Sequence, residues 1–83
     1  MDRLQEAIRA FIVSEYLQDP DQEIDGATPL ISGGLVDSFS MLSLKRFIER
    51  SYNISIPDHM ATSEAFDTVD QIAELIRRMR PDE

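Results

Sequence analysis

The 83-residue sequence contains no cysteine, no tryptophan and a single histidine. Without cysteine the chain forms no disulfide and offers no thiolate to a metal ion, so any thiol that it uses must come from a cofactor. One histidine without clustered ligands does not make a metal site. A chain this short cannot divide into two cores. We therefore expect one domain over residues 1–83 that depends on packing for its stability.

Positive charge is also scarce, because eight basic side chains oppose sixteen acidic ones and the formal net charge is -8. This is the wrong sign for binding nucleic acid or anionic lipid. No apolar run approaches the length of about 20 residues that spans a bilayer. The first residues, MDRLQEAIRAFIV, lack a basic leader and a small-residue cleavage site, so we expect no signal peptide. These features favour a cytoplasmic protein without membrane insertion, whose partners have basic docking surfaces.

Apolar residues recur at helical spacing in the first segment and predict a helix that ends near Gln18. Asp2 and Gln5 have the spacing of a capping box at its start. Residues 19–36 are rich in Pro, Gly and Asp and predict a long loop. Loops of this length usually have a function. Four apolar residues are expected to pin the loop onto a helical core: Ile24, Leu30, Ile31 and Leu35.

Asp37 is suited to capping a second helix, SFSMLSLKRFIERSYN, which is apolar on two sides. Its apolar residues are Phe39, Met41, Leu42, Leu44, Phe47 and Ile48. Such a helix can bury one stripe and offer the other to a bound chain or a partner, although a well-buried central helix explains the pattern equally well. Asn53 is expected to end it.

The stretch ISIPDHM alternates like a short strand, but Pro57 would remove a ladder hydrogen-bond donor, so we expect a loop. A short third helix is expected within residues 58–66. Thr68 and Gln71 form another capping box before a last helix, which Pro81 ends. The sequence therefore predicts an all-α fold with three main helices, one short third helix and a long first loop, packed as a four-helix bundle.

The string SGGLVDSF, residues 32–39, places a serine hydroxyl at the first turn of the second helix. Backbone N–H groups at a helix start favour an anion on the Ser38 oxygen, with the helix dipole adding roughly 0.3 to 1 kcal/mol. A cap at Asp37 would keep Ser38 outside the core and accessible to an enzyme. An ordinary helix cap explains the same two residues. The functional interpretation depends on the whole arrangement of long loop, serine and apolar helix.

Here the motif Asp37-Ser38-Phe39 resembles the Asp-Ser-Leu motif of the acyl carrier protein family, in which the modified serine opens the second helix after a long first loop. The resemblance extends through GGLVDSFSMLSLKRFIERSYNISIP to FDTVDQIAELI and covers nearly the whole chain. Gly-Leu-x-Asp-Ser is also similar to carriers that are served by stand-alone adenylating ligases, including D-alanyl carrier proteins.

The resemblance implies a carrier, not an enzyme, with 4'-phosphopantetheine attached covalently to Ser38 between Asp37 and Phe39. Its thioester would carry an acyl or aminoacyl group, and its tether would raise the effective concentration of that cargo at each partner. The expected partners are a phosphopantetheinyl transferase, an acyl- or aminoacyl-loading ligase or synthase, and an acyltransferase or other acceptor enzyme. Partner or cargo contacts are expected at Met41, Leu42, Lys45, Arg46 and Met60.

Two features depart from the family pattern. Phe39 stands where leucine is usual, and the second helix lacks the strongly acidic face of typical fatty-acid carriers. The residues on that face are Ser40, Ser43, Lys45, Arg46 and Glu49. Because charge complementarity governs encounter rate and discrimination between partners, we expect a specialised lipid or secondary-metabolite pathway.

Other interpretations of the sequence fit less well. A hydrolase triad of Ser38, Asp37 and His59 lacks the strand that precedes a nucleophile elbow. The acidic residues 19–25 lack the glycine and glutamate positions of an EF-hand, and Gly33-Gly34 lacks the lysine of a phosphate loop. The main alternative to a carrier is an unmodified helical interaction domain that docks a partner through its second helix.

Overall fold

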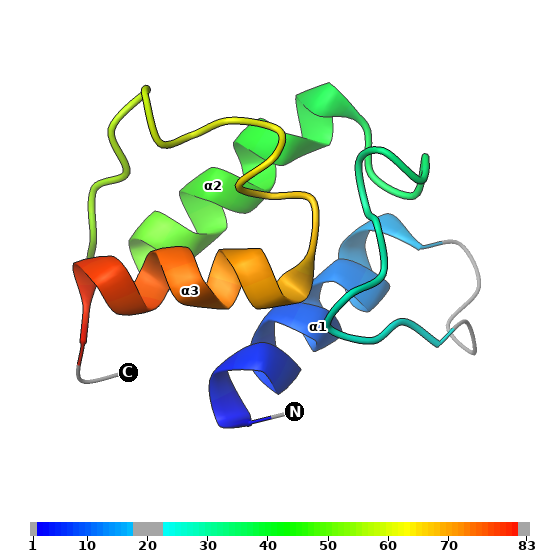
Figure 1. Ribbon diagram of the computed structural model, residues 1–83, viewed down its shortest axis with the longest axis horizontal. Coiled ribbons are helices and arrows are strands. Elements are labelled where there is room, and N and C mark those ends of the chain that lie inside the picture. The colour runs from blue at the N-terminus through cyan, green and yellow to red at the C-terminus, as the bar shows by residue number, and fades with distance from the viewer. Residues whose placement is uncertain (1, 18–22, 82–83) are drawn as a thin grey trace.

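The computed structural model describes residues 2–17 and 23–81, with the backbone but not the side chain of Ser38. Three helices, α1 (Arg3–Tyr16), α2 (Ser38–Tyr52) and α3 (Val69–Met79), are joined by irregular segments, and the described residues contain no strand (Figure 1). The predicted all-helical class is confirmed.

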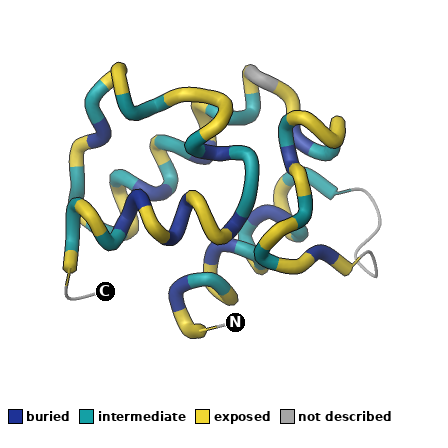
Figure 2. The backbone as a smooth tube through the Cα atoms, viewed as in Figure 1, coloured by how far each residue is buried: buried dark blue, intermediate teal, exposed yellow. Residues whose placement is uncertain are grey.

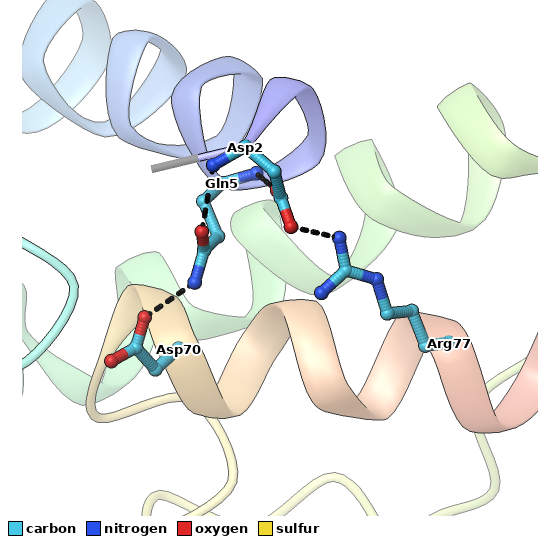
Figure 3. Close-up of polar contacts among 4 residues, drawn as sticks. All are labelled: Asp2, Gln5, Asp70 and Arg77. Carbon is cyan, nitrogen blue, oxygen red and sulfur yellow. Dashed lines mark hydrogen bonds and ion pairs between the residues drawn. The ribbon is translucent and has the colours of Figure 1, made fainter.

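The capping box predicted at the start of α1 is present. The Asp2 carboxylate accepts a hydrogen bond from the Gln5 amide at 3.0 Å, and the Gln5 side chain accepts one from the Asp2 amide at 2.9 Å. The same two side chains reach α3, where Gln5 donates to Asp70 at 2.6 Å and Asp2 pairs with Arg77 (Figure 3). Local capping and tertiary contact therefore share residues at this end of α1.

Helix ends lie close to their predicted positions. α1 ends at Tyr16 with an extended Leu17, while Gln18 and residues 19–22 of the predicted loop lie outside the described residues. α2 ends before Asn53, which has a left-handed φ of 54°. Asparagine tolerates that conformation better than most residues, so it ends a helix readily. α3 ends at Met79, two residues before Pro81.

The core is entirely apolar and draws on all three helices and on the segments between them (Figure 2). Its buried residues are Leu4, Ile8, Ile12, Ile24, Leu30, Val36, Leu44, Ile48, Ile56, Phe66, Val69, Ile72, Ala73, Leu75 and Ile76. Ile24 and Leu30 come from the first long loop, and Ile31 and Leu35 pack partly buried against the core. The described part of that loop, residues 23–36, is therefore pinned as predicted.

The short helix expected within residues 58–66 does not form. Two turns, at residues 58–60 and 63–66, take its place. The first contains a single hydrogen bond of the α-helical type, from the Ala61 amide to the Pro57 carbonyl at 3.1 Å. One such bond does not compensate for the backbone entropy of starting a helix, and Phe66 anchors the segment by burying its ring completely. The four-helix count is thus not confirmed.

Candidate functional site

Ser38 is the first residue of α2, as the sequence predicted. Its side chain lies outside what the structure describes, so the outward direction of its hydroxyl stays a prediction. Both of its neighbours in the chain are at the surface, because Asp37 is exposed and Phe39 is 86% exposed. The start of α2 therefore lies at the surface of the protein and not in its core.

Asp37 caps α2 in the predicted way. Its Oδ1 accepts a hydrogen bond from the Ser40 amide at 2.7 Å, and its backbone carbonyl accepts one from the Met41 amide at 3.2 Å. The bond from the Ser40 amide, followed by one from the Ser40 side chain, lowers the pKa of the Asp37 carboxyl. The charged carboxylate is thus the form that holds the first turn of α2.

The loop in front of Ser38 folds around the carbonyl of Leu30. This carbonyl accepts hydrogen bonds from the amides of Leu35 and Val36 at 2.8 and 2.9 Å. Since Leu30 and Val36 are both buried, the loop is fixed to the core on each side of its turn. The chain reaches α2 from a position that packing determines.

Two glycines make the turn within this loop possible. Gly34 has a φ of 82°, which glycine adopts without the steric penalty of a side chain. A Cβ on Gly33 would collide with the backbone carbonyl of Pro29. The chain therefore makes a tight turn at Gly33-Gly34 that other residues would strain.

Asp67, just before α3, holds the loop from a distant part of the chain. Its Oδ1 accepts hydrogen bonds from the amides of Ile31 and Ser32, each at 2.8 Å, and its Oδ2 accepts one from the Ser32 hydroxyl at 2.7 Å. These bonds lower the pKa of the Asp67 carboxyl, and the bond from the Ser32 amide is the largest cause. Sequence analysis missed Asp67, whose one local signal is its place before the cap Thr68.

α2 presents Phe39 and Leu42 as the two large apolar side chains that are exposed among the described residues, at 86% and 54%. Three residues apart, they lie on the same face of the helix. Arg46 follows one turn later and is also exposed. The structure therefore brings three predicted site residues together. Leu42 and Arg46 were predicted to contact a partner or cargo, and Phe39 was predicted beside the modified serine.

The other predicted contact residues lie elsewhere. Lys45 is partly buried, with its Nζ 4.0 Å from a carboxylate oxygen of Asp58. Met41 and Met60 are partly buried against the core. Met60 also lines a second groove, of about 320 Å³, between the 58–66 segment and α3. A cargo contact at Met60 would thus involve a different surface from that of Phe39.

A groove of about 570 Å³ lies between α1 and α2 beside the exposed face. Phe11 and Glu15 line it from α1, while Phe39, Leu42, Arg46 and Arg50 line it from α2. Sequence analysis predicted that α2 has a second apolar side but did not find the α1 residues, because their place depends on how the two helices pair.

No group of three or more His, Asp or Glu side chains in the described ranges, 2–17 and 23–81, is arranged to hold a metal ion. None of the helices in those ranges has the length and apolar character to cross a bilayer.

Comparison with known proteins does not assign the chain to a family. No family model matches the sequence, and none of the curated proteins is significantly similar to it.

Proposed function

We propose that this protein is a carrier of the acyl carrier protein class, which holds an acyl or aminoacyl group as a thioester on 4'-phosphopantetheine attached to Ser38. The observation that carries the proposal is the place of Ser38, at the first residue of a helix and between two exposed neighbours. A modifying enzyme must be able to approach residue 38. The position of this residue at a helix start on the protein surface allows that approach. Phosphate esters are favoured at helix starts for electrostatic reasons.

The loop geometry also fits the proposed cofactor. The Asp37 carboxylate accepts a hydrogen bond from the Ser40 amide and so orders the first turn of α2. The Asp67 carboxylate accepts hydrogen bonds from the amides of residues 31 and 32 and so holds the loop near the start of α3. A carrier must present its serine at one reproducible position to several enzymes in turn, and a pinned loop reduces the entropy that each encounter costs. The acidic chain would supply this position and perform no chemistry on the cargo.

Attachment of the arm would be a phosphoryl transfer. The Ser38 hydroxyl oxygen forms a bond to the phosphorus that bears the pantetheine of coenzyme A, and the bond from that phosphorus to the departing 3',5'-ADP breaks. The serine proton passes to a base on the phosphopantetheinyl transferase. Once attached, the group supplies the thiol that the cysteine-free chain lacks.

The proposal includes a single carrier domain, a cytoplasmic location and a fold of the four-helix carrier type. The 58–66 segment, which forms two turns, would then occupy the place of the short third helix of that type. Loading ligases or synthases and acceptor enzymes would be the remaining partners. The basic residues of α2 favour a specialised pathway over general fatty-acid synthesis.

Intact mass tests the proposal. Co-expression with a broad-specificity phosphopantetheinyl transferase should add about 340 Da, and the addition should disappear in Ser38→Ala. Ser43→Ala is the matched control, since Ser43 is an exposed serine on the same helix and should leave the addition intact. No added mass, or mass that persists in Ser38→Ala, would defeat the carrier hypothesis.

A second candidate is an unmodified domain that docks a partner through α2. The exposure of Phe39 and Leu42 beside a groove favours it, because a surface of this kind usually marks an interaction site. Both candidates use α2, and the mass measurement separates them.

A further inference from the structure

The exposed face of α2 differs in charge from the rest of the protein. α2 has three basic residues and one acidic residue, Glu49, whereas the remaining sequence has fifteen acidic and five basic residues. The Glu49 carboxylate accepts a hydrogen bond from the Ile56 amide at 2.8 Å, so it is engaged with the segment that follows α2. The overall charge predicts basic partners, but this one helix has the opposite preference.

Arg46 and Arg50 give the face its charge. They are four residues apart on α2, so they lie on the same side of the helix, and both are exposed and line the groove. Neither forms an ion pair with any residue in the described part of the chain, and Glu15 is the only described carboxylate that lines the groove. Guanidinium groups that are exposed and have no ion pair within the described residues are suited to binding carboxylates of another molecule.

The apolar residues of the face adjoin these arginines. Phe39, Leu42, Arg46 and Arg50 follow one another at helical spacing along α2, and exposed aromatic residues and arginines are the types that dominate protein interfaces. Phe39 lines the groove and is 86% exposed, so its ring can also enter a pocket on a partner.

The face is also held in place before any partner arrives. The rings of Phe11 and Phe47, on α1 and α2, stack with centroids 3.7 Å apart and planes within 10°. The Tyr16 hydroxyl donates a hydrogen bond to the Ser40 carbonyl at 3.2 Å. A surface that is already ordered loses less conformational entropy on binding.

We propose that this face docks a partner protein that presents an apolar pocket rimmed by carboxylates. The pocket receives Phe39 and Leu42, and the carboxylates pair with Arg46 and Arg50. The inference deepens the proposed carrier function and rests on it for one point, that the partner is an enzyme acting at Ser38.

A second copy of the chain is a poorer occupant, because a symmetric dimer through this face would place Arg46 and Arg50 of both copies in one interface. Anionic lipid is also a poorer one, since α2 has three basic residues in a chain of net charge -8, fewer than the four to eight, by a rough rule, that bind such lipid.

Two synthetic helical peptides test the proposal. Both peptides have the same apolar stripe. One, the glutamate peptide, has glutamate on both borders of the stripe, and the other, the lysine peptide, has lysine there. Each is titrated into the unmodified, ¹⁵N-labelled protein. The glutamate peptide should shift the amide resonances of Phe39, Leu42 and Arg46. Its affinity should fall at least about tenfold in Arg46→Glu, as expected when a charge pair becomes a repulsion. Arg3→Glu makes the same charge change at an exposed site away from the groove and should alter affinity less than about twofold.

Phe39→Ser provides a second variant that leaves the core intact, and it should weaken the glutamate peptide without changing the preference for glutamate over lysine. Equal affinity for the two peptides, shifts confined to another surface, or unchanged affinity in Arg46→Glu would overturn the proposal. Concentration-dependent shifts of the same α2 resonances without peptide would do so as well, in favour of a second copy. The titration requires no cofactor, so its result is independent of the mass measurement. If the protein gains mass at Ser38 but binds both peptides equally, the docking proposal fails and the carrier proposal stands.

Discussion

α3 and α2 are both amphipathic helices, yet they use their apolar residues differently. α3 buries five of its 11 residues on one side, whereas α2, with 15 residues, buries Leu44 and Ile48 among its described side chains and exposes Phe39 and Leu42. Exposing large apolar side chains gives up the free energy that their burial would contribute. α3 therefore contributes mainly to stability, and α2 combines a core stripe with a surface suited to binding.

The two helices are linked through the loop before α2. Asp67, directly before the cap of α3, binds the amides of Ile31 and Ser32 in that loop. The segment at the start of α3 thus positions the start of α2. Substitutions can test whether α3 contributes mainly to stability and α2 mainly to binding.

The largest expected effect is at the core side of α3. Ile76→Ala should lower the free energy of unfolding by about 2–5 kcal/mol, because it removes buried methyl groups and leaves a cavity. Leu42→Ala on α2 should change it by no more than about 0.5 kcal/mol, since that side chain is 54% exposed. Urea denaturation followed by circular dichroism measures both. Equal losses would show that α2 is as structural as α3.

A smaller effect is expected at the link between the helices. Asp67→Ala leaves the amides of Ile31 and Ser32 without their acceptor and should cost about 1–3 kcal/mol. Hydrogen exchange at these two amides should accelerate more than exchange inside α3. Glu64→Ala is the control, as Glu64 is an exposed carboxylate in the same segment. If it has the same effect, the link does not depend on the Asp67 hydrogen bonds.

The smallest effect concerns pH. Among the described residues, the carboxyls with a lowered pKa are those of Asp2, Asp25, Asp37 and Asp67, all below the ordinary 3.8. The folded protein binds fewer protons there than the unfolded chain, so their contribution is complete above pH 3.8 and is lost as the pH falls through the lowered values. The urea midpoint should decline below that pH, and less steeply in Asp67→Asn. A decline of unchanged slope in Asp67→Asn would remove Asp67 from this account.

Structural features that depend on residues a few positions apart were predictable from the sequence. Each helix cap accepts a hydrogen bond from the backbone amide three residues further on, and the caps are Asp2, Asp37 and Thr68. Both partners of each bond are therefore close together in the sequence. The Gly33-Gly34 turn and the helix end at Asn53 are equally local. The short helix expected within residues 58–66 is not confirmed, because two separate turns occupy that segment.

The candidate site was only partly predictable. Ser38 and its cap follow from the sequence, and so does the second apolar side of α2. The separation of Met60 from Phe39, and the contribution of Phe11 to the groove, required the packing of segments that are distant in the sequence.

Helix positions, their caps and the place of Ser38 at a helix start are encoded within short stretches of chain, since hydrogen bonds and apolar spacing act there over three or four residues. The exposure of Phe39 and Leu42 was settled by the packing of the folded chain, as was the hold of Asp67 on Ser32, 35 residues away. Such contacts depend on which helix faces pack together, and the spacing of residues along one helix does not specify its neighbour.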